Sequence, residues 1–553
     1  MAGVSGFQVH FGARRVTNPG DYCDVLVAMN PAALKANRRW LKAGATVIID
    51  GDSLTETNLR KAGFTTDDPI AELGLDGHNL VVPGITTMTR EALKELELDN
   101  KSVVKCKNMF ALGICFYLFH RPEDHAKKYL DSKFARKNPL IAEANKRAID
   151  AGYNFAANTH QFANTYAVPA APLEKGTYRS INGNVATAWG LCAAAEKAGL
   201  PLFCGSYPIT PATVILEELA KRKDLGVKTV QAEDEIAGIC TAIGAAFAGN
   251  FAVTTTSGPG LSLKSEALGL AVMTELPLVV VDGQRWPGIP TKTEQSDLSQ
   301  ALYGRNGECP VIVVAASSPS DCFHYAFEAG RLAMEHMTPV ILLTDGFIAN
   351  GSEPWRIPAM KDYPAITPPI VDEAPEGGFM PYVRNENLAR GWAFPGKTGL
   401  EHRVGGLEKD CVKGCISHDP SNHQKMVRTR AEKVAKVVDD IPAQAVWGAP
   451  EGDLLVVGWG GTRGHLQNAV DQMRAEGKRV SLCHFNYINP LPHGVREIFS
   501  KFRKIVVCEL NEGQFANYLR QSLQEFRYEQ YNKCEGLPFT VAELCQKFES
   551  LLK

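Results

Sequence analysis

The amino-acid sequence predicts an α/β protein made of several domains with parallel sheets. Short apolar runs, such as residues 45–49 and 277–282, alternate with segments in which apolar residues recur at helical spacing. Strand, helix and strand follow one another almost throughout, which is typical of parallel strands joined by helical crossovers. With 553 residues, the chain is long enough for about three domains.

The composition is that of an ordinary globular protein, with 45% hydrophobic residues, 22% charged residues and a net charge of -2. This balance gives no basic surface for nucleic acid, and no apolar run approaches the roughly 18 residues that a membrane helix needs. The first residues lack a basic segment followed by an apolar core, so we expect a cytoplasmic protein. Fourteen cysteines without a secretory signal fit free thiols in a reducing compartment.

The first predicted domain covers residues 1–170. Residues 24–28, 45–49 and 102–105 predict strands, and residues 31–41 predict a helix between the first two. We therefore expect a small parallel α/β domain here.

The second predicted domain, residues 171–365, carries at least five strands and most candidate functional residues. Residues 205–213, Gly-Ser-Tyr-Pro-Ile-Thr-Pro-Ala-Thr, follow an apolar strand. Thr210 is predicted to cap a helix that begins at Pro211, because Thr is common at the N-cap and Pro at the first helical position. The free N–H groups of a helix start can hold a small carboxylate, although a helix cap alone would also explain the pattern.

Three acids follow the next predicted strand, residues 227–231. Glu233, Asp234 and Glu235 are expected in the first turn of a helix over residues 232–245. Carboxylates at a helix start are favoured by the helix dipole, so they need no function to explain them.

Two further segments end where ligands bind in parallel sheets. A predicted strand from residue 251 enters a turn at Ser257 and Gly258, and glycine lets the backbone approach a ligand closely. Residues 277–282 predict another strand, after which Arg285 lies at its carboxyl end. A plain strand–helix connection and a surface ion pair are the alternatives for these two segments.

The remaining sequence predicts a connecting segment and a last domain. Residues 366–440 are polar and rich in Pro and Gly with weak periodicity, so we predict a linker or an extended arm that could wrap a partner. Residues 441–553 predict strands near 453–458, at 479–483 and at 504–508. The glycines near the end of the first of these strands do not fit the Gly-x-Gly-x-x-Gly pattern of dinucleotide binding.

The cysteines do not predict an iron–sulfur cluster, since no Cys-x-x-Cys occurs. Cys411 and Cys415 form the nearest pair, and three histidines, His402, His418 and His423, flank them. A metal site is one interpretation, and scattered loop residues are the other, which the polar, turn-rich surroundings favour.

Several motifs together resemble the 2-oxoacid:ferredoxin oxidoreductases. These are Tyr-Pro-Ile-Thr-Pro at residues 207–211, Glu-Ile-Ala-Gly at 235–238 and Thr-Lys-Thr-Glu-Gln at 291–295. Over nearly the whole chain, the order of segments is similar to the alpha subunit of 2-oxoglutarate:ferredoxin oxidoreductase with a gamma-type domain fused in front.

The resemblance implies three domain types. Residues 1–170 would be the gamma-type domain, residues 171–365 a pyrimidine-binding thiamine diphosphate domain, and residues 441–553 a transketolase C-terminal-like domain that is mainly structural. Two departures from the family pattern stand out. No Gly-Gly-Gln-Gly loop precedes residue 7, so the first domain is expected to lack its first strand, and the stretch after Arg285 is shortened to residues 286–288.

The resemblance also implies roles for single residues. Glu235, with Glu233 as second choice, would face N1′ of the thiamine aminopyrimidine and favour its imino tautomer, for which we expect a raised carboxyl pKa. Ser257 and Gly258 would lie at the cofactor. The substrate would be gripped by Tyr207, Pro208, Ile209, Thr210, Arg285 and Thr291, with Thr210 and Arg285 counted as catalytic.

The sequence lacks the Gly-Asp-Gly that holds thiamine diphosphate through Mg²⁺. The resemblance therefore implies a beta subunit that supplies Mg²⁺, the diphosphate grip and a [4Fe-4S] cluster, with no metal site in this chain. An (alpha-beta)2 heterotetramer and ferredoxin as electron acceptor are implied as well.

The expected reaction is the reversible, coenzyme A-dependent oxidative decarboxylation of 2-oxoglutarate to succinyl-CoA and carbon dioxide. The same chemistry on pyruvate or a branched-chain 2-oxoacid remains open. A non-catalytic assembly subunit is the alternative from another class.

Overall fold

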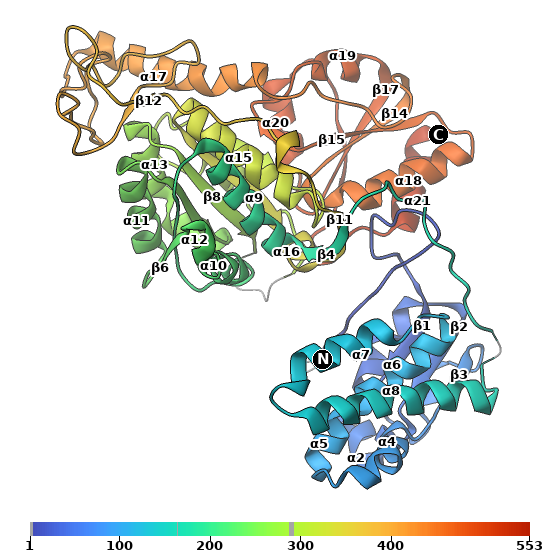
Figure 1. Ribbon diagram of the computed structural model, residues 1–553. Helices are drawn as coiled ribbons and strands as arrows, with labels where there is room; N and C mark the ends of the chain where they lie inside the picture. Colours follow the sequence, from blue (N-terminus) through green and yellow to red (C-terminus); the bar gives the residue numbers. More distant parts are fainter. Residues whose placement is uncertain (1–3, 163, 287–291) are drawn as a thin grey trace. The chain divides into compact units, whose positions relative to one another are not determined.

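The computed structural model describes residues 4–162, 164–286 and 292–553. It consists of two compact units, Met1–Glu174 and Lys175–Lys553 (Figure 1). Parallel sheets flanked by helices in both units confirm the predicted α/β class. Within the described residues, no helix has both the length and the apolar character required to cross a membrane. The finer division of the second unit at residues 365 and 440 stays a prediction.

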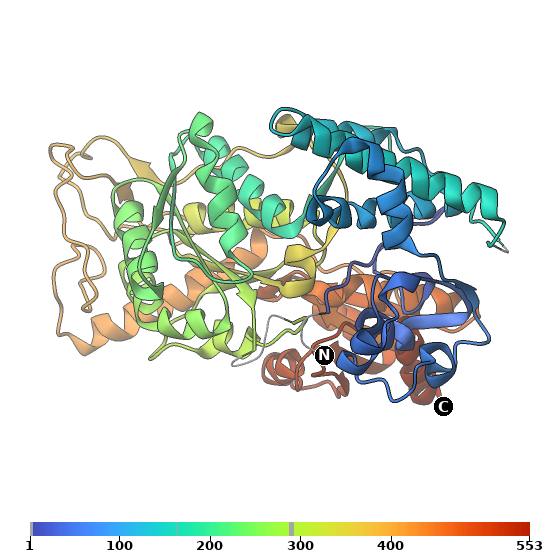
Figure 2. The ribbon, with the colours of Figure 1, turned by 90° about the horizontal axis from the view of Figure 1, so that it is seen from below.

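The first unit is built on a three-stranded parallel sheet of order β1-β2-β3. Its elements are β1 (Cys23–Ala28), α1 (Pro31–Asn37), β2 (Leu41–Ile49), α2 (Glu56–Lys61), α3 (Pro69–Leu73), β3 (Asn79–Val81), α4 (Ile85–Leu93), α5 (Asn100–Lys105), α6 (Lys107–Leu118), α7 (Asp124–Leu130) and α8 (Pro139–Thr159). The apolar alternation of β2 explains the layers: Val47 and Ile49 pack under α1 to α3, whereas Ile48 faces α6 and α8. Figure 2 shows the helices of residues 107–159 (lighter blue to cyan) gathered beside the sheet-bearing part (darker blue).

The predicted strands at 24–28 and 45–49 and the helix between them are confirmed. The strand predicted at residues 102–105 is wrong, because these residues belong to α5. Asp99 is the physical reason: its side chain accepts a hydrogen bond from Ser102 N at 3.0 Å and so caps a helix start. The turn then directs Val103 into a small core beside α8.

The second unit opens with a larger parallel sheet that carries the candidate site residues. The elements of the second unit up to residue 356 are β4 (Tyr178–Asn182), α9 (Gly183–Ala198), β5 (Leu202–Ser206), α10 (Thr213–Ala220), β6 (Lys228–Gln231), α11 (Glu235–Phe247), β7 (Phe251–Thr256), α12 (Gly258–Leu263), α13 (Ser265–Thr274), β8 (Leu278–Gln284), α14 (Leu298–Tyr303), β9 (Ile312–Ala315), α15 (Cys322–His336), β10 (Pro339–Asp345), α16 (Gly346–Asn350) and β11 (Ser352–Arg356). Of these, β4 and β11 pair with each other in a separate antiparallel sheet. The strand order β9-β10-β8-β7-β5-β6 is parallel throughout. Helices α9, α10 and α15 cover one face, and α11, α12 and α13 cover the other.

The carboxyl-terminal part forms a second parallel sheet of order β15-β14-β17-β18. Its elements are β14 (Gly452–Trp459), α18 (Arg463–Ala475), β15 (Val480–Phe485), β16 (Tyr487–Asn489), α19 (Val495–Ser500), β17 (Phe502–Glu509), α20 (Gln514–Ser522), β18 (Glu529–Asn532) and α21 (Val541–Leu552). The predicted strands near 453, at 479–483 and at 504–508 are confirmed as β14, β15 and β17. β16 is not part of this four-stranded sheet. It pairs antiparallel with β9 and is the seventh strand of the sheet that carries the candidate site residues.

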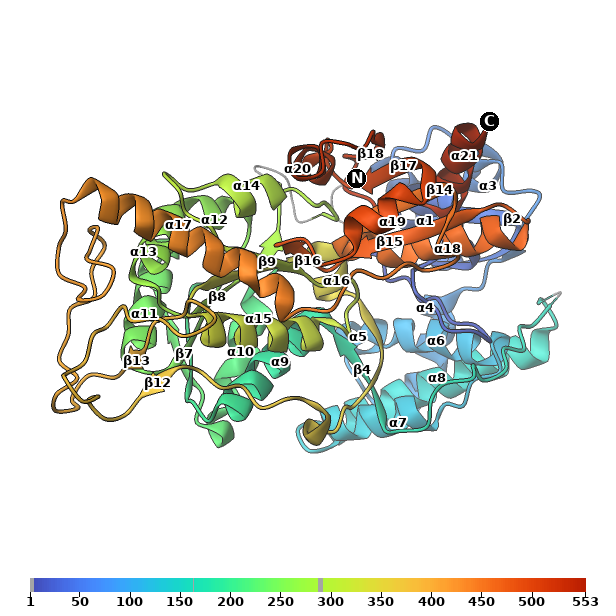
Figure 3. The ribbon, with the colours of Figure 1, turned by 90° about the horizontal axis from the view of Figure 1, so that it is seen from above.

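The segment between the two sheets, residues 366–440, is called the arm below. It holds the short strands β12 (Ile370–Val371) and β13 (Trp392–Ala393) and the 17-residue helix α17 (Pro420–Lys436), which weak periodicity did not predict. Figures 1 and 3 show α17 running from the arm loops back toward the carboxyl-terminal sheet. Trp392 is 1% exposed, and its Nε1 donates to Ala246 O near the end of α11 at 3.0 Å, so the arm packs on the unit.

A buried ion cluster fixes the arm to the end of α13. Glu275, 1% exposed, receives hydrogen bonds of 2.6 Å from both Arg384 terminal nitrogens and of 2.6 Å from Lys433 Nζ. Burial alone would raise the pKa of Glu275, but the charges of Lys433 and Arg384 more than offset it and hold the pKa well below its usual range.

Two more arm cations bind the carbonyl groups that end α13. Arg390 Nε donates to Thr274 O and Glu275 O at 3.1 Å each, and Lys409 Nζ donates to Met273 O at 2.8 Å. The last carbonyls of a helix lack intrahelical partners and carry partial negative charge, so cations satisfy them well. The arm is thereby held by charges that are themselves buried.

Candidate active site

The predicted site residues follow strand ends at one edge of the seven-stranded sheet. Tyr207 follows β5, Glu235 follows β6, Ser257 follows β7 and Arg285 follows β8. Because these strands are parallel, their carboxyl ends meet at the same edge, where ligands bind in open α/β sheets. The structure therefore gathers residues that lie up to 78 positions apart (285 minus 207).

The loop after β5 differs from its predicted form. Helix α10 begins at Thr213, so the prediction that Thr210 caps a helix starting at Pro211 is wrong. Thr213 closes the turn instead: its hydroxyl accepts from Ile209 N at 2.8 Å and donates to Ile209 O at 2.9 Å. Pro208 and Thr210 are exposed, and Ile209 is half-buried. Thr210 thus lies on the open side of the loop.

Glu235 opens α11, as the sequence predicts. Asp234 caps the helix by accepting from Ala237 N at 2.8 Å, and Glu233 lies before the cap and is exposed. Glu235 is half-buried. The first acid is therefore outside the helix, the second is used for capping, and the third has a carboxylate that the cap does not occupy.

Tyr207, Thr256 and Gly260 form the wall beside Glu235. Tyr207 Oη lies 3.0 Å from Thr256 Oγ1, and the side chain is 5% exposed. Burial raises the pKa of Tyr207 above its ordinary value, and the nearby Glu235 carboxylate adds to the effect. A Cβ at Gly260 would lie 2.1 Å from Tyr207 Oη and 3.1 Å from Glu235 Cγ, so this contact requires glycine.

Replacing Gly260 by alanine is expected to lower the free energy of unfolding by about 1–3 kcal/mol, because the new methyl group overlaps Tyr207 Oη and Thr256 Oγ1. Gly269→Ala is the matched control: Gly269 lies in α13, and a Cβ there would meet nothing within 4 Å. Urea titration of both variants measures the difference. A Gly260→Ala chain as stable as the control would contradict the close contact.

Lys264 is a site residue that the sequence did not reveal. It is 0% exposed, and its Nζ donates to Glu235 O at 2.7 Å and to Thr254 Oγ1 at 3.2 Å. The amine also lies 5.0 Å from the centre of the Tyr207 ring. Burial lowers the pKa of Lys264 to about 8, against the opposing charge of Glu235. A lysine in a helical segment gives no sequence signal of burial, which is why it was missed.

Arg285 and Thr210 are brought together. Arg285 Nη1 donates to Thr210 O at 3.1 Å, and the side chain is half-buried. Its backbone N–H donates to Asp297 Oδ2 at 2.9 Å. Thr291, the other predicted substrate contact, lies outside the described residues.

Ser257 and Gly258 occupy the turn before α12. Ser257 is 0% exposed, and within the described residues its hydroxyl has no hydrogen-bond partner. A Cβ at Gly258 would lie 2.4 Å from Arg285 O and 2.7 Å from Asp297 Oδ1. Glycine at 258 is therefore required by packing within the chain, which is a different reason from ligand approach.

Asp297 and Asp282 form a buried carboxyl pair behind this turn. Burial, together with the neighbouring Asp297 carboxylate, raises the pKa of Asp282 well above its ordinary value. Asp297 accepts from Arg285 N and from Ser296 Oγ at 2.8 Å, as an ionised carboxylate does well. Burial also raises the pKa of Asp297, to about 6, so both carboxyls of the pair bind a proton more strongly than exposed aspartates do.

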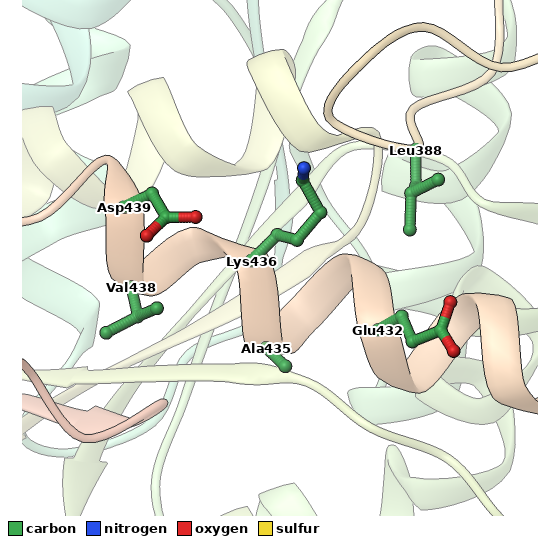
Figure 4. A pocket seen from close by; sticks show the side chains of 6 residues that line it. All are labelled: Leu388, Glu432, Ala435, Lys436, Val438 and Asp439. Atoms are coloured by element: carbon green, nitrogen blue, oxygen red, sulfur yellow. The ribbon is translucent and has the colours of Figure 1, made fainter.

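Two surface grooves of the described residues lie away from the predicted site. One of about 420 Å³ lies at the end of α17 and is lined by Leu388, Glu432, Ala435, Lys436, Val438 and Asp439. Figure 4 shows Leu388 on a loop beside the helical segment that carries the other five residues. A second of about 370 Å³ lies where the arm meets the end of α11 at Phe247. Neither includes a predicted site residue. Among the described residues, no group of three or more His, Cys, Asp or Glu side chains could hold a metal ion, Cys411 and Cys415 included.

Three family models match the chain. The one described as pyruvate flavodoxin/ferredoxin oxidoreductase, thiamine diphosphate-binding, covers residues 194–416. Pyruvate ferredoxin/flavodoxin oxidoreductase covers residues 1–155, and pyruvate:ferredoxin oxidoreductase core domain II covers residues 452–544.

Curated relatives and a solved structure agree with these matches. The chain is 47% identical to the 2-oxoglutarate oxidoreductase subunit KorA of Mycobacterium tuberculosis, over 98% of this chain and 83% of the relative. It is 35% identical to the 2-oxoglutarate synthase subunit KorA of Methanothermobacter marburgensis, over 60% of this chain and 88% of the relative. The 2-oxoglutarate:ferredoxin oxidoreductase of Magnetococcus marinus, solved with 2-oxoglutarate, coenzyme A and succinyl-CoA bound, matches with a TM-score of 0.85 and 31% identity, over 98% of this chain and 90% of that one.

Proposed function

The chain belongs to the 2-oxoacid oxidoreductase family that includes the KorA subunits, and from this premise we propose that it is the alpha subunit of a 2-oxoglutarate:ferredoxin oxidoreductase. The reaction is the oxidation of 2-oxoglutarate and coenzyme A to succinyl-CoA and carbon dioxide, with electrons passing to ferredoxin, and it is reversible in principle. The observation that carries the proposal is the meeting of Tyr207, Glu235, Ser257 and Arg285 at one sheet edge.

The residues at this edge fit thiamine diphosphate. The Glu235 carboxylate is left free by the Asp234 cap, and the Ser257 hydroxyl is buried and unpaired within the described residues. When bound, thiamine diphosphate supplies a carbon nucleophile and an electron sink for decarboxylation. Glu235 would hold the proton shared with N1′ of the pyrimidine ring, and Ser257 would offer its hydroxyl to the cofactor.

Lys264 and Tyr207 would hold Glu235 in position. Lys264 Nζ donates a hydrogen bond to the backbone carbonyl of Glu235, the first residue of α11, and so fixes the backbone from which the Glu235 side chain extends. Tyr207 keeps its phenolic proton because burial raises its pKa, so it can face the carboxylate without repelling it. These contacts come from the chain itself and do not depend on a ligand.

Substrate binding falls to the open side of the same edge. Thr210 is exposed, Arg285 is half-buried beside it, and we infer that the pair orients the 2-oxoacid with Thr291 and the loop residues Pro208 and Ile209. A guanidinium can bind a carboxylate through two parallel hydrogen bonds, which suits Arg285 to the role.

The partner subunit is inferred from the incomplete cofactor site of this chain. Glu235 is half-buried in this chain, so a second surface is needed to enclose the cofactor. We infer a beta subunit that brings the diphosphate grip, Mg²⁺ and a [4Fe-4S] cluster, and an (alpha-beta)2 assembly in the cytoplasm.

The test is anaerobic, coenzyme A-dependent reduction of a viologen dye by this chain, alone and co-expressed with a beta subunit. We expect activity only when the chain is co-expressed with the beta subunit, with 2-oxoglutarate preferred over pyruvate and branched-chain acids. Preference for another 2-oxoacid would keep the proposed reaction but assign that acid as the substrate. A stable complex with thiamine and cluster bound but no turnover of any 2-oxoacid would overturn the proposed function.

Replacing Arg285 by lysine is expected to raise the KM for 2-oxoglutarate roughly ten- to a hundredfold, with a smaller change in kcat. A lysine keeps the charge but cannot make two parallel hydrogen bonds to a carboxylate. Steady-state kinetics of the complex measures the effect. Arg503→Lys is the control, since Arg503 is exposed in a 3.6 Å ion pair with Asp453. An unchanged KM would leave Arg285 as a residue that merely ties the loop at Thr210.

A further inference from the structure

Gln295 is completely buried although it lies only ten positions after Arg285 (295 minus 285) on a connecting segment. Building on the proposed function, we propose that Gln295 is a positioning residue for the 2-oxoacid. It fixes residues 295–299 against the carboxyl-terminal sheet, so that this sheet, which the sequence predicts to be mainly structural, helps set the position of Arg285 through Asp297.

Four hydrogen bonds join Gln295 to the carboxyl-terminal sheet. Its backbone N–H donates to Leu510 O at 3.1 Å, and its Oε1 accepts from Leu510 N at 2.9 Å. Its Nε2 donates to Trp459 O at 2.7 Å, and Asn511 Nδ2 donates to Gln295 O at 2.9 Å. An amide side chain has a donor and an acceptor, so no other uncharged residue of this length could make both side-chain bonds.

The partners of Gln295 belong to a rigid part of the fold. Trp459 ends β14, and Leu510 and Asn511 directly follow β17. The buried carboxylate of Glu509 links these two strand ends, because it accepts from Trp459 Nε1 and Asn511 Nδ2 at 3.1 Å each. Gln295 is therefore fixed to two strands of a sheet rather than to a loose loop.

The position of Gln295 is passed on to Arg285 through Asp297. Asp297 N–H donates to Gln284 Oε1 at 3.2 Å, and Asp297 Oδ2 accepts from Arg285 N at 2.9 Å. These bonds join Asp297 to Gln284 and Arg285 at the end of β8. Arg285 in turn reaches Thr210 O, so a shift of the segment at Gln295 would move both substrate residues.

Gln514 makes a second, less buried connection to the same segment. Its Nε2 donates to Ser296 O at 2.9 Å, and its Oε1 accepts from Ser299 N at 2.7 Å. Residues 295–299 are thus joined to the carboxyl-terminal part by one glutamine of their own, Gln295, and by one that opens α20, Gln514. Other hydrogen bonds also join the two sheets, among them Asn486 Nδ2 to Ala315 O at 2.8 Å and Asn489 Nδ2 to Val311 O at 2.7 Å, but these lie at or next to β9. The bonds of Gln295 and Gln514 lie instead on residues 295–299, which Asp297 connects to Arg285.

The test compares three glutamine-to-methionine variants of the alpha chain in the complex with the beta subunit. Methionine keeps the side-chain length and volume but loses both hydrogen bonds. Gln295→Met and Gln514→Met remove the two connections. Gln300→Met is the matched control, since Gln300 lies five positions further on and bonds to Ser262 Oγ at 2.7 Å, within the first sheet's own helices.

We expect Gln295→Met to raise the KM for 2-oxoglutarate about tenfold with a smaller loss of kcat, the effect of losing buried hydrogen bonds that position the binding residues. Gln514→Met should act in the same direction with a smaller change, and Gln300→Met should match the wild type. Hydrogen exchange of residues 292–299 should quicken in Gln295→Met and Gln514→Met without any substrate present. If Gln295→Met does not assemble, Gln514→Met carries the test.

A purely structural role predicts a different pattern. A lowered thermal midpoint with an unchanged KM in both Gln295→Met and Gln514→Met would overturn the proposal. A wild-type complex that turns over no 2-oxoacid would overturn the proposed function and this role with it. The two failures are told apart by the wild type, which is active in the first case and inactive in the second.

Discussion

Glu235→Gln is expected to abolish the oxidation of 2-oxoglutarate while the complex stays assembled. Glutamine has the shape of glutamate but cannot exchange a carboxyl proton, so the proton shared with the thiamine pyrimidine would be lost, at a cost of about 10²- to 10⁴-fold in rate. Assembly should persist, because Lys264 binds the backbone carbonyl of Glu235 and the helix cap belongs to Asp234. Viologen reduction, together with the thiamine and cluster content of the purified complex, measures both effects.

Glu233→Gln is the matched control for this experiment. Glu233 is exposed and precedes the cap of α11, so its replacement should leave the rate unchanged. Loss of activity in Glu233→Gln with retention in Glu235→Gln would transfer the role to Glu233. Retention in both variants would argue against proton exchange by this helix start and for an assembly subunit.

Glu275→Gln is expected to destabilise the arm by about 3–5 kcal/mol. The substitution leaves Lys433 and Arg384 buried without their counter-ion, and an uncompensated buried charge is costly. Faster hydrogen exchange of α17 measures the loss. Glu266→Gln, an exposed site on the same helix α13, should leave the exchange unchanged, and equal exchange in the two variants would contradict the cluster.

The same carboxylate predicts an acid limit for the arm. Because the pKa of Glu275 is lowered in the folded chain, its stabilisation is fully present above the ordinary pKa of glutamate, about 4.3. It is lost as the pH falls below that value toward the folded pKa. The protection of α17 should follow this course in wild type and lack it in Glu275→Gln.

The fold class and the position of most site residues could be predicted, because they depend on local signals. β5, β7 and β8 each begin with at least three consecutive apolar residues, and parallel strands place their carboxyl ends at one edge. Tyr207 and Arg285 directly follow two of these strands. Their roles rest on the family motifs and stay predictions.

The errors occurred where a single side chain overrides a pattern. Residues 102–105 contain two valines and predict a strand, but the Asp99 cap makes them helical. The Thr210-Pro211 pair has the form of a helix start, yet the hydroxyl of Thr213 forms the turn and delays the helix. In both cases a hydrogen bond of one side chain to the backbone decides the structure.

The missed residues are buried polar groups whose partners are distant in sequence. Lys264 bonds to Glu235, 29 positions away, and Gln295 bonds to Trp459, 164 positions away. The sequence predicts a linker or an extended arm at residues 366–440 for the same reason, because nothing in the sequence pairs Arg384 and Lys433 with Glu275. Polar burial depends on tertiary contacts that periodicity does not encode.

The pairing of β16 with β9 has a consequence for the solubility of the chain. All four residues of β9 are buried, and its outer edge would otherwise present free N–H and C=O groups on an apolar strand. Such edges recruit strands from other molecules and lead to aggregation. β16 comes from the far end of the sequence, so the edge stays open until the last part of the chain has been made. The carboxyl-terminal residues therefore cover the β9 edge of the seven-stranded sheet and protect it from self-association. A chain cut after α17 would leave this edge open.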